Sequence, residues 1–299
     1  MGKIKGVYAA SLSILKSDLS LDIDATVKHA EDVIDLGCHG TVFFGSTGQS
    51  QLISLSEKIQ LINSLPKSKY KDKFIIGTGL NSLSDNINLI KISMSIGFDK
   101  FLIMPPAYYK YDDNDVINFY SKIIEEVNNC KIILYNFEKL SGYKFSEECV
   151  VKLASKFPNQ IIGIKDSSYN LFEKLKIDNF SVMPGSESKL LKGLELGCDG
   201  IITATTNVTA FLAREVYDNF INNLTQDSNQ RLCDIRSEFE KYNLISALHA
   251  FMSQKNLMFN NILPPLNILP EIDKAKLFSN LKNLDFHIEN LKAAWYEID

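Results

Sequence analysis

The chain has 299 residues, of which 45% are hydrophobic and 23% charged, so it can bury the core of one large globular domain, with or without an appendage. A formal net charge of −4 leaves no basic stripe for a phosphate backbone, so nucleic acid is not an expected partner. No apolar stretch approaches the roughly 20 residues that a membrane helix needs, so a membrane is not an expected partner either.

Short apolar runs alternate with longer segments of helical period over the first two thirds of the chain. The apolar runs resemble buried strands, and there are eight of them: Val7–Leu12, Gly40–Phe44, Phe74–Gly79, Lys100–Met104, Lys131–Asn136, Ile161–Asp166, Phe180–Gly185 and Gly200–Ala204. Helical patterns between them include residues 24–36, 54–65, 114–127 and 187–196. The second of these opens with a Ser54-x-x-Glu57 capping box.

Eight buried strands alternating with helices fit either a closed eight-stranded barrel or a doubly wound open sheet. The count favours the barrel, and the place where a dinucleotide-binding sheet carries G-x-G-x-x-G holds Ser13-Ile14-Leu15-Lys16. Beyond about Leu224 the alternation stops and the pattern is helical, broken by Pro264-Pro265. We therefore predict a (β/α)8 TIM barrel over residues 1–224 and a C-terminal helical appendage over residues 225–299.

Lys165 lies near the end of the sixth apolar run, I-I-G-I-K-D-S-S, at residues 161–168. An amine at the end of a buried strand loses solvation, and a neutral amine is a nucleophile toward a carbonyl carbon. A lysine that is merely solvated at the edge of its strand is the alternative. Reacting groups of such barrels lie where the strands end on the C-terminal face, so the residues at the other strand ends bear on the choice.

Polar side chains also follow the second and fifth apolar runs. Gly45 to Gln49 reads G-S-T-G-Q, which places the hydroxyls of Ser46 and Thr47 between two glycines, where exposed backbone N–H groups can hold a carboxylate. An ordinary turn ahead of a helix is the other interpretation. Tyr135 can pass a proton to a carbinolamine beside Lys165, or it can be an amphipathic tyrosine at the barrel rim.

Three motifs in chain order resemble the dihydrodipicolinate synthase and N-acetylneuraminate lyase family: G-S-T-G-Q at 45–49, Y-N-x-x-x-L-S-G at 135–142 and G-I-K-D-S-S at 163–168. That family consists of Schiff-base-forming, pyruvate-dependent aldolases on a (β/α)8 barrel. The resemblance covers nearly the whole chain and includes G-V-Y-A-A near the start, P-P-A-Y-Y after the fourth run, G-S-E-S after the seventh and P-P-L at 264–266. Three ordered motifs at matching strand ends form a specific signal.

The resemblance implies a role for each matching residue. Lys165 would attack the keto carbon of pyruvate to form the imine. Tyr135 would transfer protons during imine formation and C–C cleavage. Ser46 and Thr47 would bind the carboxylate, with Gly48 allowing close approach of the backbone.

The same resemblance implies an oligomer. Tyr108 matches a tyrosine that in many members reaches into the neighbouring subunit's site, although the P-A-Y-Y spelling leaves Tyr109 as the alternative. We therefore expect a homodimer, commonly doubled to a homotetramer.

Some positions depart from the pattern of dihydrodipicolinate synthases. These enzymes usually carry an arginine for the carboxylate of aspartate semialdehyde where this chain has Leu140. None of the three arginines of this chain falls in the first seven predicted strand–loop units. A guanidinium that binds a second carboxylate or a phosphate through two parallel hydrogen bonds is therefore hard to place. Leu140-Ser141-Gly142 looks more like sialic acid lyases and 2-keto-3-deoxy sugar acid aldolases.

Two further positions bear on the second substrate. Glu187 falls where sialate lyases use an acidic residue on sugar hydroxyls, or it simply begins a helix whose dipole favours a carboxylate there. The turn that starts at Thr203 matches the substrate-binding turn of either branch only in part.

The sequence therefore predicts a pyruvate-dependent class I aldolase, a lyase that cleaves or forms a 2-keto-3-deoxy sugar acid. Dihydrodipicolinate synthase, N-acetylneuraminate lyase or related dehydratase activity stays open, as does an inactive binding protein on the same fold. The covalent lysine imine needs no other cofactor, and the four histidines show no metal-ligand spacing. The five cysteines are scattered and include no C-x-x-C pair, which is typical of reduced thiols in the cytoplasm.

Overall fold

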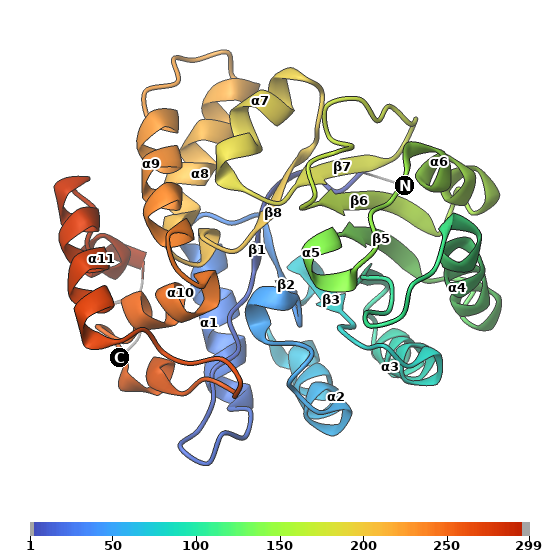
Figure 1. The fold of residues 1–299 in the computed structure, drawn as a ribbon, viewed down its shortest axis with the longest axis horizontal. Coiled ribbons are helices and arrows are strands. Elements are labelled where there is room, and N and C mark those ends of the chain that lie inside the picture. Colours follow the sequence, from blue (N-terminus) through green and yellow to red (C-terminus); the bar gives the residue numbers. More distant parts are fainter. Residues whose placement is uncertain (1–2, 295–299) are drawn as a thin grey trace.

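Eight parallel strands form the centre of the computed structural model, which describes residues 3–294 (Figure 1). They are β1 (Gly6–Ala10), β2 (Gly40–Phe43), β3 (Phe74–Gly77), β4 (Lys100–Ile103), β5 (Lys131–Asn136), β6 (Ile161–Asp166), β7 (Ser181–Pro184) and β8 (Gly200–Thr203). Consecutive strands pair from β1 through β7, and β1 also pairs with β8. Between β7 and β8, the Asp199 N–H donates to the Val182 carbonyl at 3.0 Å. The predicted (β/α)8 TIM barrel is confirmed.

Six of these strands end one or two residues earlier than the apolar runs predicted. The cause is clear at β2, because Phe44 has a φ of 52° and this left-handed conformation turns the chain out of the strand. The remaining apolar residues of such runs belong to the loops on the C-terminal face. They therefore shape the cavities there.

Helices follow most of the strands and cover the outside of the barrel (Figure 1). They are α1 (Ile23–Asp35), α2 (Leu55–Ser64), α3 (Leu83–Ser95), α4 (Asp113–Glu126), the short α5 (Glu138–Ser141), α6 (Glu147–Lys156), α7 (Leu190–Glu195) and α8 (Thr206–Ile221). The capping box predicted at α2 is present: the Ser54 hydroxyl accepts from the Glu57 N–H, and the Glu57 carboxylate accepts from the Ser54 N–H at 3.2 Å.

Three more helices follow the barrel: α9 (Asn229–Glu240), α10 (Leu244–Met252) and α11 (Glu271–Asn283). In Figure 1, α9 lies beside α8 and α10 beside α1, and α11 packs on the outside of α9 and α10. Helix α9 packs on α8 and on the 3-10 turn Glu187–Lys189 that follows β7, and α10 contacts the turn Ser46–Gly48 that follows β2. The C-terminal helices therefore reach the end of the barrel where the strands finish. The predicted domain boundary near residue 224 stays a prediction.

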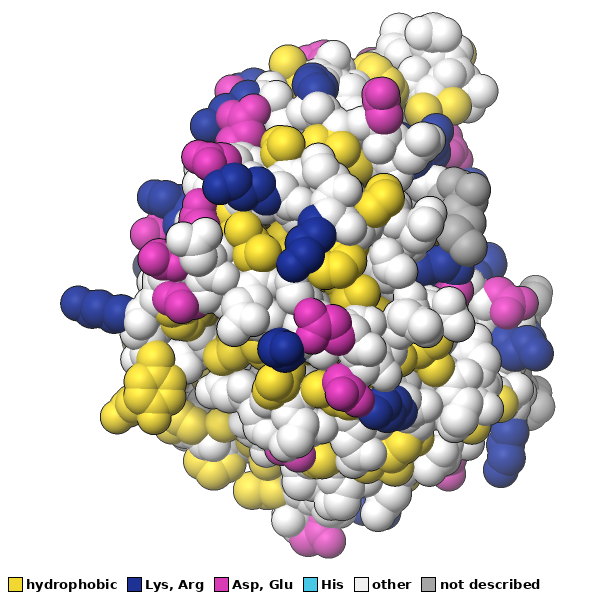
Figure 2. Space-filling view, turned by 90° about the vertical axis from the view of Figure 1, so that its right-hand side faces the viewer, with side chains coloured by type: hydrophobic (Ala, Val, Ile, Leu, Met, Phe, Trp, Pro, Cys, Tyr) yellow, Lys and Arg dark blue, Asp and Glu magenta, His cyan; other side chains and the backbone are white. Residues whose placement is uncertain are grey.

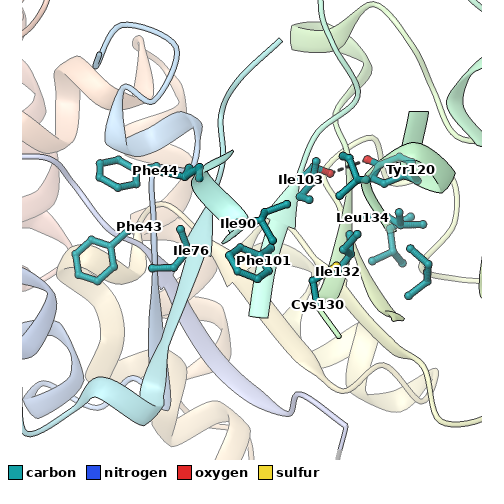
Figure 3. Packing of buried hydrophobic residues seen from close by; sticks show 14 of the residues in the cluster. Phe43, Phe44, Ile76, Ile90, Phe101, Ile103, Tyr120, Cys130, Ile132 and Leu134 are labelled. Atoms are coloured by element: carbon teal, nitrogen blue, oxygen red, sulfur yellow. Dashed lines mark hydrogen bonds between the residues drawn. The ribbon is translucent and has the colours of Figure 1, made fainter. Parts of the chain in front are cut away.

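Two hydrophobic layers hold the barrel. The outer layer lies between strands and helices and contains Phe101, Ile132 and Leu134 (Figure 3). There the Tyr120 hydroxyl donates to the Ile103 carbonyl at 2.8 Å, so this buried phenol is satisfied. The inner layer fills the barrel with one or two side chains from most strands: Val42, Ile75, Leu102, Ile133, Met183 and Ile202.

An irregularity in β6 determines which way Lys165 points. Ile132 of β5 pairs with Ile161, but the next residue, Ile133, pairs with Gly163, so Ile162 is an extra residue on β6. Ile161 packs in the outer layer and Ile162 against the inner one. Strict alternation from Ile161 would send Lys165 outward, and the one-residue shift turns it toward the barrel interior.

The connection from β6 to β7 contains no α-helix among residues 167–180, all of which the structure describes. Asp166, fully buried at the end of β6, organises this segment instead. Its Oδ2 accepts the N–H groups of Leu171 and Phe172, both at 2.9 Å, and its Oδ1 accepts the N–H of Tyr169 at 2.9 Å. The Asn136 amide of β5 also donates to Oδ1, at 2.8 Å, which ties the ends of the two strands together.

Charged side chains of both signs are interspersed on the face of the molecule shown in Figure 2. This distribution agrees with a net charge close to zero for a chain of this size. Among residues 3–294, no helix combines the length and the apolar character that crossing a membrane would require.

Gly163→Ala should destabilise the protein, because a Cβ there would lie 2.7 Å from the backbone oxygen of Ser181 in β7. We expect the free energy of unfolding, measured by urea denaturation, to fall by about 1–3 kcal/mol. Gly45→Ala is the matched control, since Gly45 has a φ of −73° and its new Cβ would meet only Ala10, at 3.6 Å. Equal stability of the two variants would contradict the tight β6–β7 contact.

Candidate active site

The aligned ends of β5 and β6 place a lysine beside a tyrosine. Tyr135 is the register partner of Lys165, and both side chains are nearly fully buried. The Lys165 Nζ lies 4.2 Å from the centre of the Tyr135 ring. The geometry thus brings a primary amine and a phenol hydroxyl into one small space at the C-terminal end of the barrel.

The turn after β2 supplies a hydroxyl to the same place. Ser46 Oγ lies 2.9 Å from the Tyr135 hydroxyl, within hydrogen-bond distance. The Ser13 hydroxyl donates to the Gly48 carbonyl at 2.7 Å and so fixes the turn to the loop after β1. A Cβ on Gly48 would lie 2.8 Å from the Ser11 oxygen, so the close contact between these loops requires glycine.

A cavity of about 190 Å³ opens over these groups. Ser46, Thr47, Tyr135 and Lys165 line it, and its remaining wall consists of Phe137, Lys139, Ser167, Tyr169, Gly185, Ala204, Arg236, Glu240 and Leu244. A Cβ on Gly185 would fall 2.1 Å from the Ser167 hydroxyl and 3.1 Å from its Cα, so a side chain there would force Ser167 to shift. The four residues that the sequence grouped at the ends of β2, β5 and β6 therefore share one cavity.

A second, more apolar cavity of about 320 Å³ shares Ser46 and Tyr135 with the first. Leu140 lines this second cavity but not the first. The apolar residues beside it in the second cavity are Leu52, Leu102, Met104, Ile245 and Leu266. Leu140 itself is 46% exposed. The position that carries an arginine in dihydrodipicolinate synthases is therefore part of a hydrophobic wall.

Glu187 is fully buried and does not line the cavity above Lys165. Its Oε2 accepts from Arg236 Nη1 at 2.9 Å and from the Thr203 hydroxyl at 2.8 Å. The Thr205 hydroxyl adds a third hydrogen bond, at 3.2 Å. Glu187 and Thr203 thus lie behind Arg236, and the guanidinium, rather than the carboxylate, faces the cavity.

Arg236 is the main residue of this site that the sequence reasoning missed. It comes from α9, 71 positions after Lys165, where the chain pattern is only that of a helix. The rarity of arginine is the one signal that the sequence offers, since the chain has only three of them. Two neighbouring carboxylates outweigh the burial of the guanidinium and raise the pKa of Arg236. Tyr169 was also missed, and burial raises its pKa to about 12.

The candidate inter-subunit tyrosines lie on the surface. Tyr108 is 88% exposed and Tyr109 is 74% exposed, and their rings contact each other edge to face. Tyr108 has a φ of 90°, which is strained for a residue with a side chain. Neither ring lines the cavity that contains Lys165.

Lys58 is a second buried lysine, and its surroundings differ from those of Lys165. It lies on α2 and donates to the carbonyls of Thr78 and Gly79 at 2.7 and 3.2 Å. No carboxylate within residues 3–294 forms an ion pair with it, and burial lowers its pKa to about 7. Lys58 lines neither cavity, so its amine supports the end of β3 and is not accessible to a substrate.

The lowered pKa of Lys58 predicts a pH dependence of stability. The unfolded chain binds a proton at Lys58 up to about pH 10.4, whereas the folded protein releases it near pH 7, so stability should rise with pH across that window. Relative to Lys58→Met, the free energy of unfolding of the wild type should rise by about 3 kcal/mol from pH 7 to pH 10.

Urea denaturation at several pH values measures this difference. Lys91→Met, which removes an exposed lysine of α3, is the control and should follow the wild type. Parallel curves for the wild type and Lys58→Met would show that Lys58 titrates normally in the folded protein.

Comparison with known proteins identifies relatives along the chain. The model of the Dihydrodipicolinate synthetase family matches residues 3–284. An N-acetylneuraminate lyase of Clostridium perfringens is 29% identical over 72% of this chain and 76% of its own. A 2-dehydro-3-deoxy-D-gluconate/2-dehydro-3-deoxy-phosphogluconate aldolase of Picrophilus torridus is 28% identical over 74% of this chain and 85% of its own. The structure of a prophage protein of the dihydrodipicolinic acid synthase family from E. coli K12, in complex with pyruvate, superposes with a TM-score of 0.85 at 24% identity, covering 95% of this chain and 99% of that one.

Proposed function

Because the chain belongs to the dihydrodipicolinate synthetase family, whose members are lyases and aldolases, we propose that it cleaves or forms a 2-keto-3-deoxy sugar acid through an imine between Lys165 and pyruvate. The observation that carries this proposal is the shared cavity of Lys165, Tyr135 and Ser46, with the amine 4.2 Å from the tyrosine ring and the two hydroxyls 2.9 Å apart.

Imine formation needs a nucleophile and a proton carrier. The Lys165 amine attacks C2 of the keto acid and gives a carbinolamine. Tyr135 then donates a proton to the C2 hydroxyl of the carbinolamine, which leaves as water. The Ser46 hydroxyl, hydrogen-bonded to that of Tyr135, keeps the phenol oriented during the transfer. Thr47 and the backbone N–H groups of the turn that ends at Gly48 hold the carboxylate of the keto acid.

Cleavage follows from the imine. When the C3–C4 bond breaks, its electron pair moves into the protonated imine and forms an enamine, while Tyr135 accepts the proton of the C4 hydroxyl and the aldehyde leaves. Protonation of the enamine at C3 gives the pyruvate imine, and water then releases pyruvate from Lys165. Condensation is the same sequence in reverse, and neither direction uses a metal or another cofactor.

The walls of the two cavities favour an uncharged tail on the second substrate. Leu140 adds a hydrophobic surface where an arginine would bind a second carboxylate. Arg236 lies in the cavity, but Glu187 and Glu240 already occupy two of its nitrogens. Arg236 therefore offers no free bidentate pair of nitrogens for a carboxylate or a phosphate in this cavity.

The quaternary part of the proposal concerns Tyr108. Tyr108 is exposed, has a strained backbone and does not line the cavity that contains Lys165 in its own chain. Such a side chain suits a contact with a second copy of the chain, so we propose a homodimer or a homotetramer. We also propose that the enzyme acts in the cytoplasm, where its scattered cysteines would stay reduced.

Steady-state assays of pyruvate release from 2-keto-3-deoxy acids test the proposal. Lys165→Met should lower kcat by about 10³-fold or more, because Lys165 is the amine that lies against Tyr135 and its loss removes the proposed imine. Tyr135→Phe should lower kcat by about 10²–10⁴-fold, because it removes the proton carrier and keeps the ring. Lys139→Met, which removes another lysine of the same cavity, is the control and should retain the imine chemistry.

Three results would count against this function. Full activity of Lys165→Met would exclude the imine. Faster condensation of pyruvate with aspartate semialdehyde than turnover of every 2-keto-3-deoxy acid would identify a dihydrodipicolinate synthase instead. Pyruvate binding without turnover of any substrate would indicate an inactive binding protein.

A further inference from the structure

We propose that Arg236 and Glu240 form a subsite for the hydroxyl groups on the tail of the aldehyde half of the substrate. This inference rests on the proposed aldolase function and specifies what that cavity binds. Both residues lie on α9, outside the barrel, and both line the cavity that contains Lys165. The i,i+4 spacing puts them on one face of the helix, where Arg236 Nε donates to Glu240 Oε1 at 2.7 Å.

The hydrogen bonds of Arg236 leave one nitrogen for a ligand. Its Nη1 lies within 3.1 Å of three oxygens, which belong to Glu187, Thr203 and Thr205. Its Nε is taken by Glu240. Nη2 forms no hydrogen bond with any residue in the described range 3–294, although the side chain is only 6% exposed. Arg236 lines the cavity and Nη2 is not among the buried polar atoms without a partner, so its two N–H groups are open to a ligand in the cavity.

Glu240 supplies the complementary acceptor. One of its oxygens binds Arg236, its side chain is 46% exposed, and it borders the same cavity. A hydroxyl group can accept a hydrogen bond from Arg236 and donate one to Glu240 at the same time. A pair of neighbouring hydroxyls on a sugar chain therefore matches this donor and acceptor.

Charge distinguishes a hydroxylated tail from an anionic one. Arg236 and Lys139 bring two positive charges to the cavity, and Glu187 and Glu240 bring two negative charges. The protonated imine at Lys165 adds one more positive charge, which the carboxylate of the bound keto acid offsets, so the sum around the tail is zero. A phosphate or a second carboxylate would approach Glu240 without a net positive field to stabilise it. Neutral hydroxyls meet no such penalty.

The buried pair also explains why Arg236 stays in place without a ligand. Glu187 neutralises the guanidinium from behind, and the two threonine hydroxyls complete the hydrogen bonds around the carboxylate oxygen that binds it. The rotamer of Arg236 is thereby fixed before substrate arrives. A preorganised donor loses little entropy on binding, which favours specificity for the group that it meets.

The test compares two substrates that share the reacting centre. One is 2-keto-3-deoxygluconate, whose tail carries hydroxyls, and the other is 4-hydroxy-2-ketopentanoate, whose tail is a methyl group. Glu240→Gln should lower kcat/KM for the first by about 10–100-fold, mainly through KM, because a charge-assisted hydrogen bond is lost. The same variant should change kcat/KM for the second by less than about twofold.

Two further variants complete the design. Glu238→Gln changes a carboxylate of the same helix that does not line the cavity, and it should leave both substrates unaffected. Arg236→Lys keeps a positive charge for Glu187 and removes Nη2, so it should reproduce the selective loss seen in Glu240→Gln. Circular dichroism and thermal unfolding report whether each variant is folded.

Borohydride trapping of pyruvate separates the two levels of the proposal. Suppose that the variants still trap pyruvate on Lys165, but kcat/KM is unchanged for both substrates or falls by the same factor for both. The subsite is then wrong and the aldolase function stands. If the wild type traps no pyruvate, the aldolase function fails, and the subsite fails with it.

Discussion

The pairing of β5 with β6 is the constraint on which the candidate site depends. Parallel strands with a fixed register place Tyr135 opposite Lys165, and the next pair, Asn136 and Asp166, is tied by a hydrogen bond of 2.8 Å. The extra residue Ile162 sets this register, since without it the lysine would point toward the helices. A local irregularity in one strand thus decides whether the barrel interior contains an amine.

In the proposed function, the chemistry and the selectivity of the site come from different parts of the chain. The groups for the imine lie at the ends of β2, β5 and β6, inside a barrel held by packed side chains on both faces of its strands. The polar wall that we propose for the second substrate comes from α9, supported by Glu187 after β7. Such a division lets the C-terminal helices change the substrate while the reacting centre stays the same.

Sequence patterns were enough for the barrel and for the residues at the strand ends, because buried parallel strands are continuous apolar runs and the residues after them meet at one face. They could not reveal the bulge at Ile162, since the run I-I-G-I reads as an unbroken strand. The missing helix before β7 was equally hidden, because buried Asp166 replaces helical hydrogen bonds with contacts inside the fold. Arg236 reaches the cavity through tertiary packing of α9, and no spacing in the sequence encodes that contact.

The most direct measurement is mass spectrometry of peptides from the protein after reduction with sodium borohydride in the presence of pyruvate. The register of β5 and β6 predicts a pyruvyl-derived mass on Lys165, in the peptide that contains G-I-K-D-S-S, and on no other lysine. Buried Lys58 is the internal comparison, because its amine faces two backbone carbonyls and neither cavity. An adduct on a different lysine, or no adduct at all, would contradict the proposed role of Lys165.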